Sequence, residues 1–391
     1  MKIGILELHY HEEYLETLLK LFDADEITVY TTKRIHENLD EKIRTQASKY
    51  VFKEDSQSKK DFINSIETKD FDYFFVNTIQ PSMVDVPSYV NFSPKCTSIL
   101  TLHNLEAWKS KSIHVQPNLL HTLDSFAASL FLDKILDNYD YIAVPNKYLM
   151  QTAKDYFDKP VLFIPFALCN EELQTSKETL FVIPGSVDER RRDYITVFDA
   201  FKIICEDYPD VKLMLLGRSN KDEVKKMFLG PSPTEKDKDI LRNNIITYDT
   251  YVKKETYNTF LEKACCIICP SVPTTHTINT ATETYGVTKS PNIHESIKFG
   301  KPLVLPHYIV TQTPATLHYE TSCNLFSCLQ HYLQHPEKMV ELQNIAQTFS
   351  KNFYTKEKVY KSLKDCLNIE AESRVGDDHD GKGNGNGLCR E

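Results

Sequence analysis

The stretch of sequence that decides the fold is ETYGVTKSPNIHESIKFGKP, residues 283–302. Its first part has the polar, glycine-containing composition of a loop, and residues 290–299 have the apolar spacing of a helix. Ser290 as N-cap and Pro291 at the first helical position indicate where that helix begins. Gly300 then predicts a tight turn into a strand at residues 303–305. This order of loop, helix, turn and strand is typical of one unit of an α/β protein.

The predicted start of this helix has the chemistry of an anion site. Unpaired backbone N–H groups and the positive end of the helix dipole favour a phosphate there. Ser290 and Asn292 lie at this end, and Lys289 adds a full positive charge. We therefore expect a diphosphate to bind beside these residues.

The same alternation of apolar strands and helix-period segments runs through most of the chain. Strands are expected at residues 2–8, 26–31, 73–77, 97–102, 141–144 and 161–164, and then at 180–183, 211–216, 245–247, 265–269 and 303–305. Residues 165–177 are polar and aperiodic, which predicts a linker between a domain at 1–167 and a domain at 178–350. Helices are expected at residues 325–335, 336–353 and 356–367, and disorder at 370–391.

Composition narrows the class of protein. The chain has 391 residues, of which 41% are hydrophobic, enough for two cores, and its net charge of −9 disfavours binding to nucleic acid. No signal peptide precedes the first predicted strand, and no apolar run approaches the roughly 20 residues that cross a bilayer. Cys266 and Cys269 form a CxxC spacing inside a continuous apolar run, which favours a buried strand over a zinc or redox site. We expect a cytoplasmic protein with free thiols.

A local basic cluster follows the first strand of the second half, in PGSVDERRRDY, residues 184–194. Gly185 permits a sharp backbone turn, and three consecutive arginines could neutralise a departing phosphate. Alternatively, these arginines pair with the neighbouring carboxylates at a solvated helix start. The sequence leaves both readings open.

Polar residues also follow the strands of the first half, where ligands of open α/β sheets bind. His103 and Asn104 follow one strand, Asn77 another, and His9 the first. His11 is interpreted as an ordinary exposed histidine.

The motifs of the second half occur in a fixed order that resembles the donor-binding domain of GT-B glycosyltransferases of the family-four type. They are the basic loop at 185–192, the strand before Gly217, the segment at 248–252, the Pro-Ser pair at 270–271 and the Glu-to-Pro ending at 295–302. The resemblance covers most of the chain. It implies two Rossmann-like domains that face each other across a cleft, with a C-terminal helix, residues 351–369, crossing back to the first domain.

The resemblance also implies roles for single residues. Glu295 binds the ribose hydroxyls of the donor, and Arg191 is nearest to the family's phosphate-binding lysine. His103 faces the scissile bond and, with Arg191 and Lys289, forms the expected catalytic set. The expected donor-side residues are Gly185, Ser186, Arg190, Arg192, Gly217, Tyr251, Val252, Glu283, Gly286, Ser290, Asn292 and Glu295, and the acceptor-side residues are His9, Asn77 and Asn104.

Two positions depart from the family pattern. Val287 stands where the family has a first glutamate, and Glu283 lies four residues further upstream. Ser186 stands where the family often has arginine. The donor loop is therefore expected to be longer than usual.

The implied activity is transfer of a sugar, with retention, from a nucleotide-diphosphate sugar to a glycan, lipid-linked or small-molecule acceptor. No Asp-x-Asp motif occurs in a suitable loop, so neither a metal nor another cofactor is expected, and a membrane surface is a compatible location. Two alternatives are a nucleotide-sugar-binding module without turnover and a GT-B sugar-nucleotide epimerase. An epimerase needs an acid/base pair, which the sequence does not reveal.

Overall fold

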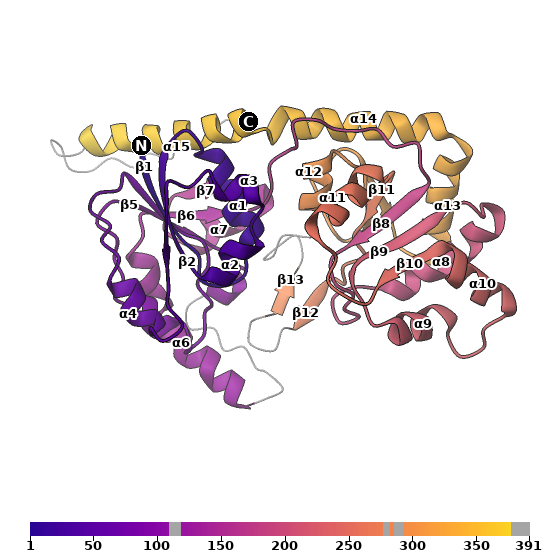
Figure 1. The fold of residues 1–391 in the computed structure, drawn as a ribbon, viewed down its shortest axis with the longest axis horizontal. Helices are drawn as coiled ribbons and strands as arrows, with labels where there is room; N and C mark the ends of the chain where they lie inside the picture. The colour runs from indigo at the N-terminus through magenta and orange to yellow at the C-terminus, as the bar shows by residue number, and fades with distance from the viewer. Residues whose placement is uncertain (109–118, 277–281, 285–292, 377–391) are drawn as a thin grey trace.

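Two parallel β-sheets, each with helices packed on it, stand side by side in the molecule (Figure 1). This computed structural model describes residues 1–108, 119–276, 282–284 and 293–376. The first sheet has seven strands in the order β3-β2-β1-β4-β5-β6-β7, and the second has six in the order β10-β9-β8-β11-β14-β15. All pairings within these two sheets are parallel. The predicted α/β class with two doubly wound domains is confirmed.

The first domain is built from short buried strands with helices on both faces of the sheet. Its strands are β1 (Lys2–Leu6), β2 (Glu26–Thr31), β3 (Lys49–Phe52), β4 (Tyr73–Val76), β5 (Thr97–Thr101), β6 (Tyr141–Val144) and β7 (Val161–Phe163). Its helices are α1 (Glu12–Leu21), α2 (Lys33–Asn38), α3 (Glu41–Arg44), α4 (Lys59–Asn64), α5 (Val86–Tyr89), the 3₁₀ turn η1 (Glu106–Trp108), α6 (Leu119–Asp137) and α7 (Lys147–Tyr156). Ile3 and Ile5 of β1 enter one core and Leu6 the other, because successive side chains of a strand point to opposite faces. Apolar helices therefore cover both faces.

The second domain repeats this design. Its strands are β8 (Leu180–Pro184), β9 (Lys212–Arg218), β10 (Ile245–Tyr248), β11 (Cys266–Ile268), β14 (Leu303–Pro306) and β15 (Thr316–Tyr319). Its helices are α8 (Tyr194–Asp207), α9 (Lys221–Leu229), α10 (Glu235–Asn244), α11 (Lys254–Lys263), α12 (His294–Phe299), α13 (Ser322–Gln334) and α14 (Pro336–Phe353). Phe181 and Ile183 of β8 pack into one core, and Leu180 and Val182 pack into the other.

The strand order of each sheet reverses direction at one point. In the first sheet, β2 lies on one side of β1 and β4 on the other. In the second sheet, β9 and β11 flank β8 in the same way. A crevice opens beyond the carboxyl ends of the strands at such points, and ligands of open α/β sheets bind in it. The residues after β1, β4, β8 and β11 are therefore the ones to examine for a site.

A hairpin between β11 and α12 interrupts this regular pattern. Its antiparallel strands are β12 (Thr274–His276) and β13 (Thr282–Thr284), with Thr275 opposite Glu283. Strand β13 contacts η1 of the first domain, and Figure 1 shows the hairpin between the two sheets. Residues 283 and 284 were predicted to be loop, and that prediction is wrong because cross-strand pairing orders them.

The helix within residues 283–302 is shorter than predicted. It begins at His294, with Ile293 in the N-cap position and no side-chain cap, rather than at Ser290. Its other end follows the prediction, since Gly300 adopts the left-handed conformation (φ 58°) that closes a helix. Lys289, Ser290 and Asn292, the residues of the expected anion site, lie outside the described residues, so that site stays a prediction.

The C-terminal helices form a strap across both domains at the top of Figure 1. Helix α14 lies over the second domain, and α15 (Lys356–Gly376) packs against α1 and β7 of the first. Val359, Leu363 and Leu367 of α15 are buried in the first domain's core. The helix continues beyond Leu367 to Gly376, so the prediction of disorder from residue 370 is wrong for its first part.

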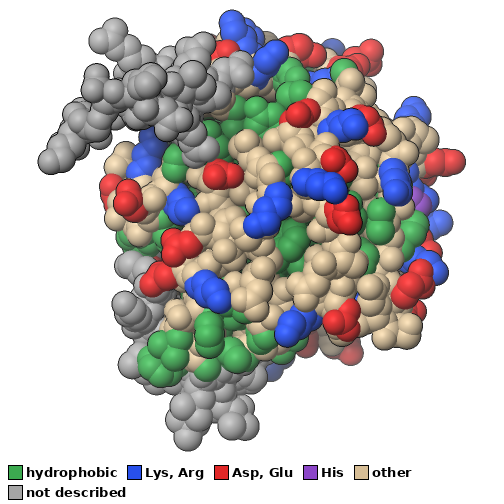
Figure 2. All heavy atoms as spheres, turned by 90° about the vertical axis from the view of Figure 1, so that its left-hand side faces the viewer, with side chains coloured by type: hydrophobic (Ala, Val, Ile, Leu, Met, Phe, Trp, Pro, Cys, Tyr) green, Lys and Arg blue, Asp and Glu red, His purple; other side chains and the backbone are tan. Residues whose placement is uncertain are grey.

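The described surface shows no single dominant charge on the face in Figure 2, where acidic and basic side chains are interspersed. Within the described ranges, no helix combines the length and apolar character that a bilayer crossing needs. In the same ranges, no three His, Cys, Asp or Glu side chains are grouped as a metal ion requires. Cys266 and Cys269 are buried, as expected, and burial raises the pKa of the Cys269 thiol to about 12.

Candidate active site

Polar residues at the strand ends of the first domain form a buried group. Glu7, which follows β1, is completely buried; its Oε1 accepts a hydrogen bond from the His9 backbone N–H at 2.6 Å and its Oε2 one from Thr78 Oγ1 at 2.7 Å. Burial raises the pKa of Glu7 to about 7, although both hydrogen bonds oppose the shift. The carboxyl can therefore change its protonation state near neutral pH.

His9 is held by a second buried carboxylate. Its Nε2 pairs with Asp85, which is 1% exposed and also pairs with Lys59. Burial raises the pKa of Asp85, but contacts with His9 and Lys59 outweigh burial and keep the pKa below its usual value. The His9 carbonyl accepts a hydrogen bond from Arg34 at 2.5 Å. Imidazole and carboxylate thus form a fixed, charge-stabilised pair at the end of β1.

The structure brings His103 of the predicted catalytic set together with two predicted acceptor-side residues, Asn77 and Asn104, around β4 and β5. His103 Nε2 donates a hydrogen bond to the Asn77 carbonyl at 3.0 Å, and Asn104 Oδ1 accepts one from the Glu106 N–H at 3.1 Å. The His103 ring stacks on His11, with centroids 3.9 Å apart. His11 is half-buried in this stack, so its interpretation as an ordinary exposed histidine is wrong.

On the second domain, two glycines allow the backbone to pack closely at the end of β8. Gly185 has a φ of 88°, and its N–H donates to the Leu216 carbonyl at 2.9 Å. A Cβ on Gly217 would lie 2.4 Å from the carbonyl group of Gly185. Both positions therefore require glycine, Gly185 because of its positive φ and Gly217 because of the close backbone contact.

The three arginines of the basic loop have different surroundings. Arg190 is 74% exposed and makes two hydrogen bonds of 3.0 Å to Asp188, which is the solvated pairing that the sequence left open. Arg191 is anchored through its backbone, whose carbonyl accepts from the Val272 N–H at 3.0 Å. Arg192 turns inward over Gly185, with its guanidinium 3.4 Å from the Gly185 oxygen. Arg192 also interacts electrostatically with Glu295. Ser186 of this loop is exposed.

Glu295 lies at the start of α12 and is held from one side. Its Oε1 accepts hydrogen bonds from the Tyr257 hydroxyl at 2.7 Å and from His294 Nε2 at 3.0 Å. Its Oε2 is buried and has no hydrogen-bond partner among the described residues. Burial raises the pKa of this carboxyl, but His294 and Tyr257 outweigh burial and lower it to about 2. Glu295 is therefore an ionised carboxylate, and one of its oxygens is buried without a hydrogen-bond partner among the described residues.

The segment expected to lie along the nucleobase follows β10. Tyr251 is 83% exposed, whereas Val252 is 7% exposed and packs into the second domain's core. The preceding backbone is fixed because the Tyr248 carbonyl accepts hydrogen bonds from the Ser219 N–H at 2.7 Å and Oγ at 3.0 Å. An exposed aromatic ring on an anchored loop is suited to stacking on a planar ligand.

A small pocket joins the two domains beside Glu295. The first domain contributes Pro145 and Asn146 to it, the linker contributes Phe166, and the second domain contributes Ile293 and His294. The Phe166 and His294 rings are 5.0 Å apart. This pocket is therefore an interdomain cleft, and its lining includes His294, the neighbour of Glu295 in the chain.

Some predicted residues cannot be placed. Gly286, Lys289, Ser290 and Asn292 lie outside the described residues. The backbone of Glu283 is described, and it lies in β13 next to the first domain.

Sequence reasoning missed several polar residues that contact the predicted ones. His294 could have been found, because it is adjacent to Glu295. Tyr257, Glu7 and Asp85 carry no motif, and only the fold brings Tyr257 to Glu295 and Asp85 to His9.

Comparisons with known proteins extend this description. No family model matches the chain, and no curated protein matches it. Sucrose-phosphate synthase from Thermosynechococcus elongatus is similar in structure, with a TM-score of 0.58 at 11% identity, covering 95% of this chain and 100% of that one. HepE from Anabaena, in complex with UDP, has a TM-score of 0.61 at 12% identity, covering 94% of this chain and 100% of that one. MnaA from S. aureus, also in complex with UDP, has a TM-score of 0.55 at 12% identity, covering 95% of this chain and 97% of that one. At such identities the likeness shows the fold alone, which is GT-B.

Proposed function

We propose that this protein is a glycosyltransferase that moves a sugar from a nucleotide-diphosphate sugar to an acceptor. The observation that carries the proposal is Glu295, an ionised carboxylate with one buried oxygen unpartnered among the described residues. Glu295 follows His294, which lines a pocket between the two Rossmann-like domains, and it interacts electrostatically with Arg192. The UDP complexes of HepE and MnaA, which share the fold, support binding of a nucleotide.

On the donor side, the proposed contacts follow from the chemistry of a nucleoside diphosphate. Glu295 Oε2 accepts a ribose hydroxyl, and the Tyr251 ring stacks on the base. Gly185 and Gly217 let the backbone approach the diphosphate. Arg191, Arg192 and Lys289 stabilise the negative charge that develops on the leaving diphosphate, so that no metal is required. Transfer with retention is part of the proposal.

On the acceptor side, the proposed contacts come from the strand ends of the first domain. His103 faces the sugar–phosphate bond, and His9, Asn77 and Asn104 line the approach of a glycan or lipid-linked acceptor. A cytoplasmic protein at a membrane surface fits such an acceptor.

The test is a thermal-shift and turnover screen with UDP-, GDP- and ADP-sugars. A ligand at 100 times its Kd should stabilise the fold by about 2.7 kcal/mol. Glu295→Ala and Arg192→Ala should lose this stabilisation, whereas Arg242→Ala, on the surface of α10 beside Asp239, should keep it. Turnover that persists in EDTA and a product whose anomeric configuration matches the donor by NMR would support metal independence and retention. If none of the nucleotide sugars stabilises the wild type, the proposal fails.

A second candidate, sugar-nucleotide epimerisation, is favoured by the buried group of Glu7, His9 and Asp85, which supplies acid/base chemistry that the sequence did not reveal. The same screen separates the candidates. An isomerised donor without acceptor identifies an epimerase, a transferred sugar identifies a transferase, and binding without either reaction identifies a module without turnover.

A further inference from the structure

The contacts of Glu295 are unevenly divided between its two oxygens. Tyr257 and His294 both bond to Oε1, at 2.7 and 3.0 Å, and Oε2 has no partner among the described residues. Two donors on one oxygen, arriving from two helices, fix the rotation of the carboxylate. A carboxylate held only by solvent would have no such preference, so this arrangement selects which of the two oxygens remains without a partner among the described residues.

Tyr257 is positioned to act only as a donor. It lies in the middle of α11, and burial, together with the charge of Glu295, holds the pKa of its phenol well above the usual value. The neutral hydroxyl therefore has its proton available for Oε1 at any pH at which the protein is folded.

His294 connects the carboxylate to the first domain. Its ring packs against Phe166 of the linker, with centroids 5.0 Å apart, and it interacts electrostatically with Glu13 on α1 of the first domain. The other charged groups that face it are Glu295 and Lys298, both on α12. His294 thus stands between a carboxylate of each domain.

The charge on His294 follows from these neighbours. Burial lowers its pKa, but the charge and hydrogen bond of Glu295, with Glu13, outweigh burial and raise it above the usual value. The protonated imidazole is therefore stabilised chiefly by Glu295 on its own helix, and additionally by Glu13 of the first domain.

We propose that His294 and Tyr257 are positioning residues for Glu295, which hold its Oε1 so that Oε2 is presented to a ribose hydroxyl of the nucleoside diphosphate. The inference rests on the proposed function and names the parts that set the specificity of its donor site for ribose. Neither residue contacts the reacting atoms.

The experiment measures discrimination between a nucleotide and its 2′-deoxy form. UDP, GDP and ADP are titrated calorimetrically into the wild type, and the one that binds is compared with its 2′-deoxy counterpart. We expect wild type to prefer the ribose form at least tenfold. His294→Ala and Tyr257→Phe should reduce this ratio to near one by weakening the ribose form alone, whereas His318→Ala, an exposed histidine on β15, should leave the ratio unchanged.

Two further measurements distinguish a positioning role of His294 from a purely structural role in stabilising the fold. His294→Gln keeps a neutral N–H near the position of Nε2, so it should restore most of the discrimination lost in His294→Ala. The wild-type affinity should also fall as pH rises from 6 to 9 and His294 loses its proton, whereas the His294→Gln affinity should not.

The outcomes are distinguishable. If the wild type binds none of the three nucleotides, the proposed function fails. If the wild type discriminates and both variants, folded by circular dichroism, discriminate equally well, the proposed function stands and the positioning role is wrong. Equal losses for ribose and deoxyribose forms also contradict it, because they indicate a general structural defect.

Discussion

At the scale of single residues, the strand ends of both sheets carry groups that the fold forces into unusual surroundings. Gly217 lies so close to the loop after β8 that a Cβ would be 2.4 Å from the Gly185 carbonyl and 2.7 Å from the Ser186 nitrogen. Glu7 is a carboxyl with no exposed surface. At Gly217 the neighbouring backbone leaves no room for a side chain, and at Glu7 burial disfavours the charged carboxylate. A separate prediction follows for each residue.

Gly217→Ala should destabilise the second domain by about 3 kcal/mol, because backbone atoms cannot move away as a flexible side chain would. Ser186→Ala in the facing loop is the matched control, since the Ser186 side chain is exposed and its loss should cost less than about 0.5 kcal/mol. Denaturant unfolding measures both. A Gly217→Ala variant as stable as Ser186→Ala would mean that the two loops are less tightly packed than described.

Glu7→Gln should flatten the dependence of stability on pH in the acidic range. The pKa of Glu7 is raised from 4.5 to about 7 in the folded state, so the carboxyl stabilises the fold below pH 4.5 and this contribution is lost as pH rises towards 7. The amide keeps an acceptor for the His9 N–H but cannot ionise. Thermal midpoints measured from pH 4.5 to 7.5 should therefore decline less in Glu7→Gln than in the wild type.

The control for Glu7 is Glu171→Gln in the exposed linker. It should reproduce the wild-type pH dependence. An unchanged profile in Glu7→Gln would show that the Glu7 carboxyl is hydrated and that its pKa is close to the usual value.

At the scale of elements, α15 is a helix that belongs to the first domain's core although it comes last in the chain. Val359, Leu363 and Leu367 are at most 7% exposed and pack with Ile3 and Ile5. Lys356 at the start of the helix pairs with Asp23, and Tyr360 contacts the ring of Phe22. The apolar face of α15 is therefore a structural part of the first domain.

Leu363→Ala should cost about 2–5 kcal/mol of stability, since it removes a buried leucine from this core. Lys364→Ala, one position further and exposed, should cost less than about 0.5 kcal/mol. Thermal unfolding followed by circular dichroism compares the two. Equal midpoints would place α15 outside the core.

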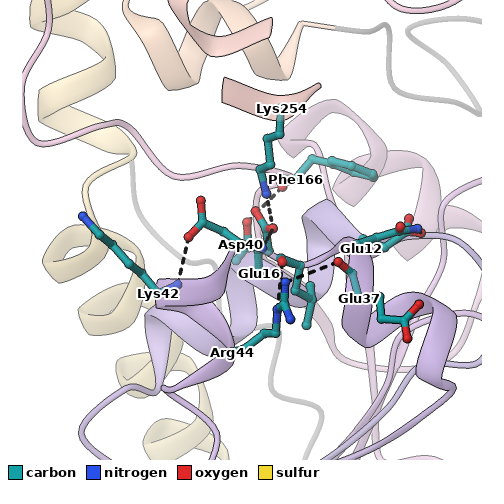
Figure 3. A network of polar contacts seen from close by, with 11 residues as sticks. Glu12, Glu16, Glu37, Asp40, Lys42, Arg44, Phe166 and Lys254 are labelled. Atoms are coloured by element: carbon teal, nitrogen blue, oxygen red, sulfur yellow. Dashed lines mark hydrogen bonds and ion pairs between the residues drawn. The ribbon is translucent and has the colours of Figure 1, made fainter. Parts of the chain in front are cut away.

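At the scale of the whole molecule, α1 provides the contacts that hold the domains together. Figure 3 shows Lys254 of α11 reaching down to Glu16, whose Oε1 also accepts a hydrogen bond from the Asp40 N–H at 3.2 Å. Thr17 Oγ1 donates to the Phe166 carbonyl of the linker at 2.9 Å. The linker is tied to the other side as well, because the Asn170 N–H donates to the Lys298 carbonyl at 2.9 Å. Glu16 is 7% exposed, so its pairing with Lys254 is better shielded from solvent than a surface ion pair.

Lys254→Ala should shift the free protein towards a more open arrangement of the domains. Glu16 then loses its partner on the second domain while each domain keeps its own core. Small-angle scattering should give a larger radius of gyration than for the wild type, and Lys225→Ala, an exposed lysine on α9, should give no change. An unchanged radius in Lys254→Ala would mean that the remaining contacts suffice to keep the domains closed.

The amino-acid sequence by itself determined the alternation of strands and helices, the irregular segment between the two sheets, and hence the α/β class. This was possible because central strands of parallel sheets are buried on both faces and read as apolar runs. Among the strands of the two parallel sheets, it missed β3 and β15, and both are edge strands. Their residues are largely half-exposed, so their apolar signal is weak.

The features of the candidate site also fall into two groups, those recognisable in the sequence and those that only the structure shows. Glu295, the glycines and the basic loop are recognisable along the chain because motifs are local, and their roles stay predictions. Only the tertiary structure decided which arginine turns inward, which oxygen of Glu295 is held, and that Tyr257 bonds to Glu295 and Asp85 pairs with His9. These features depend on contacts between residues far apart in sequence, and burial together with those contacts sets the protonation of the carboxyls involved.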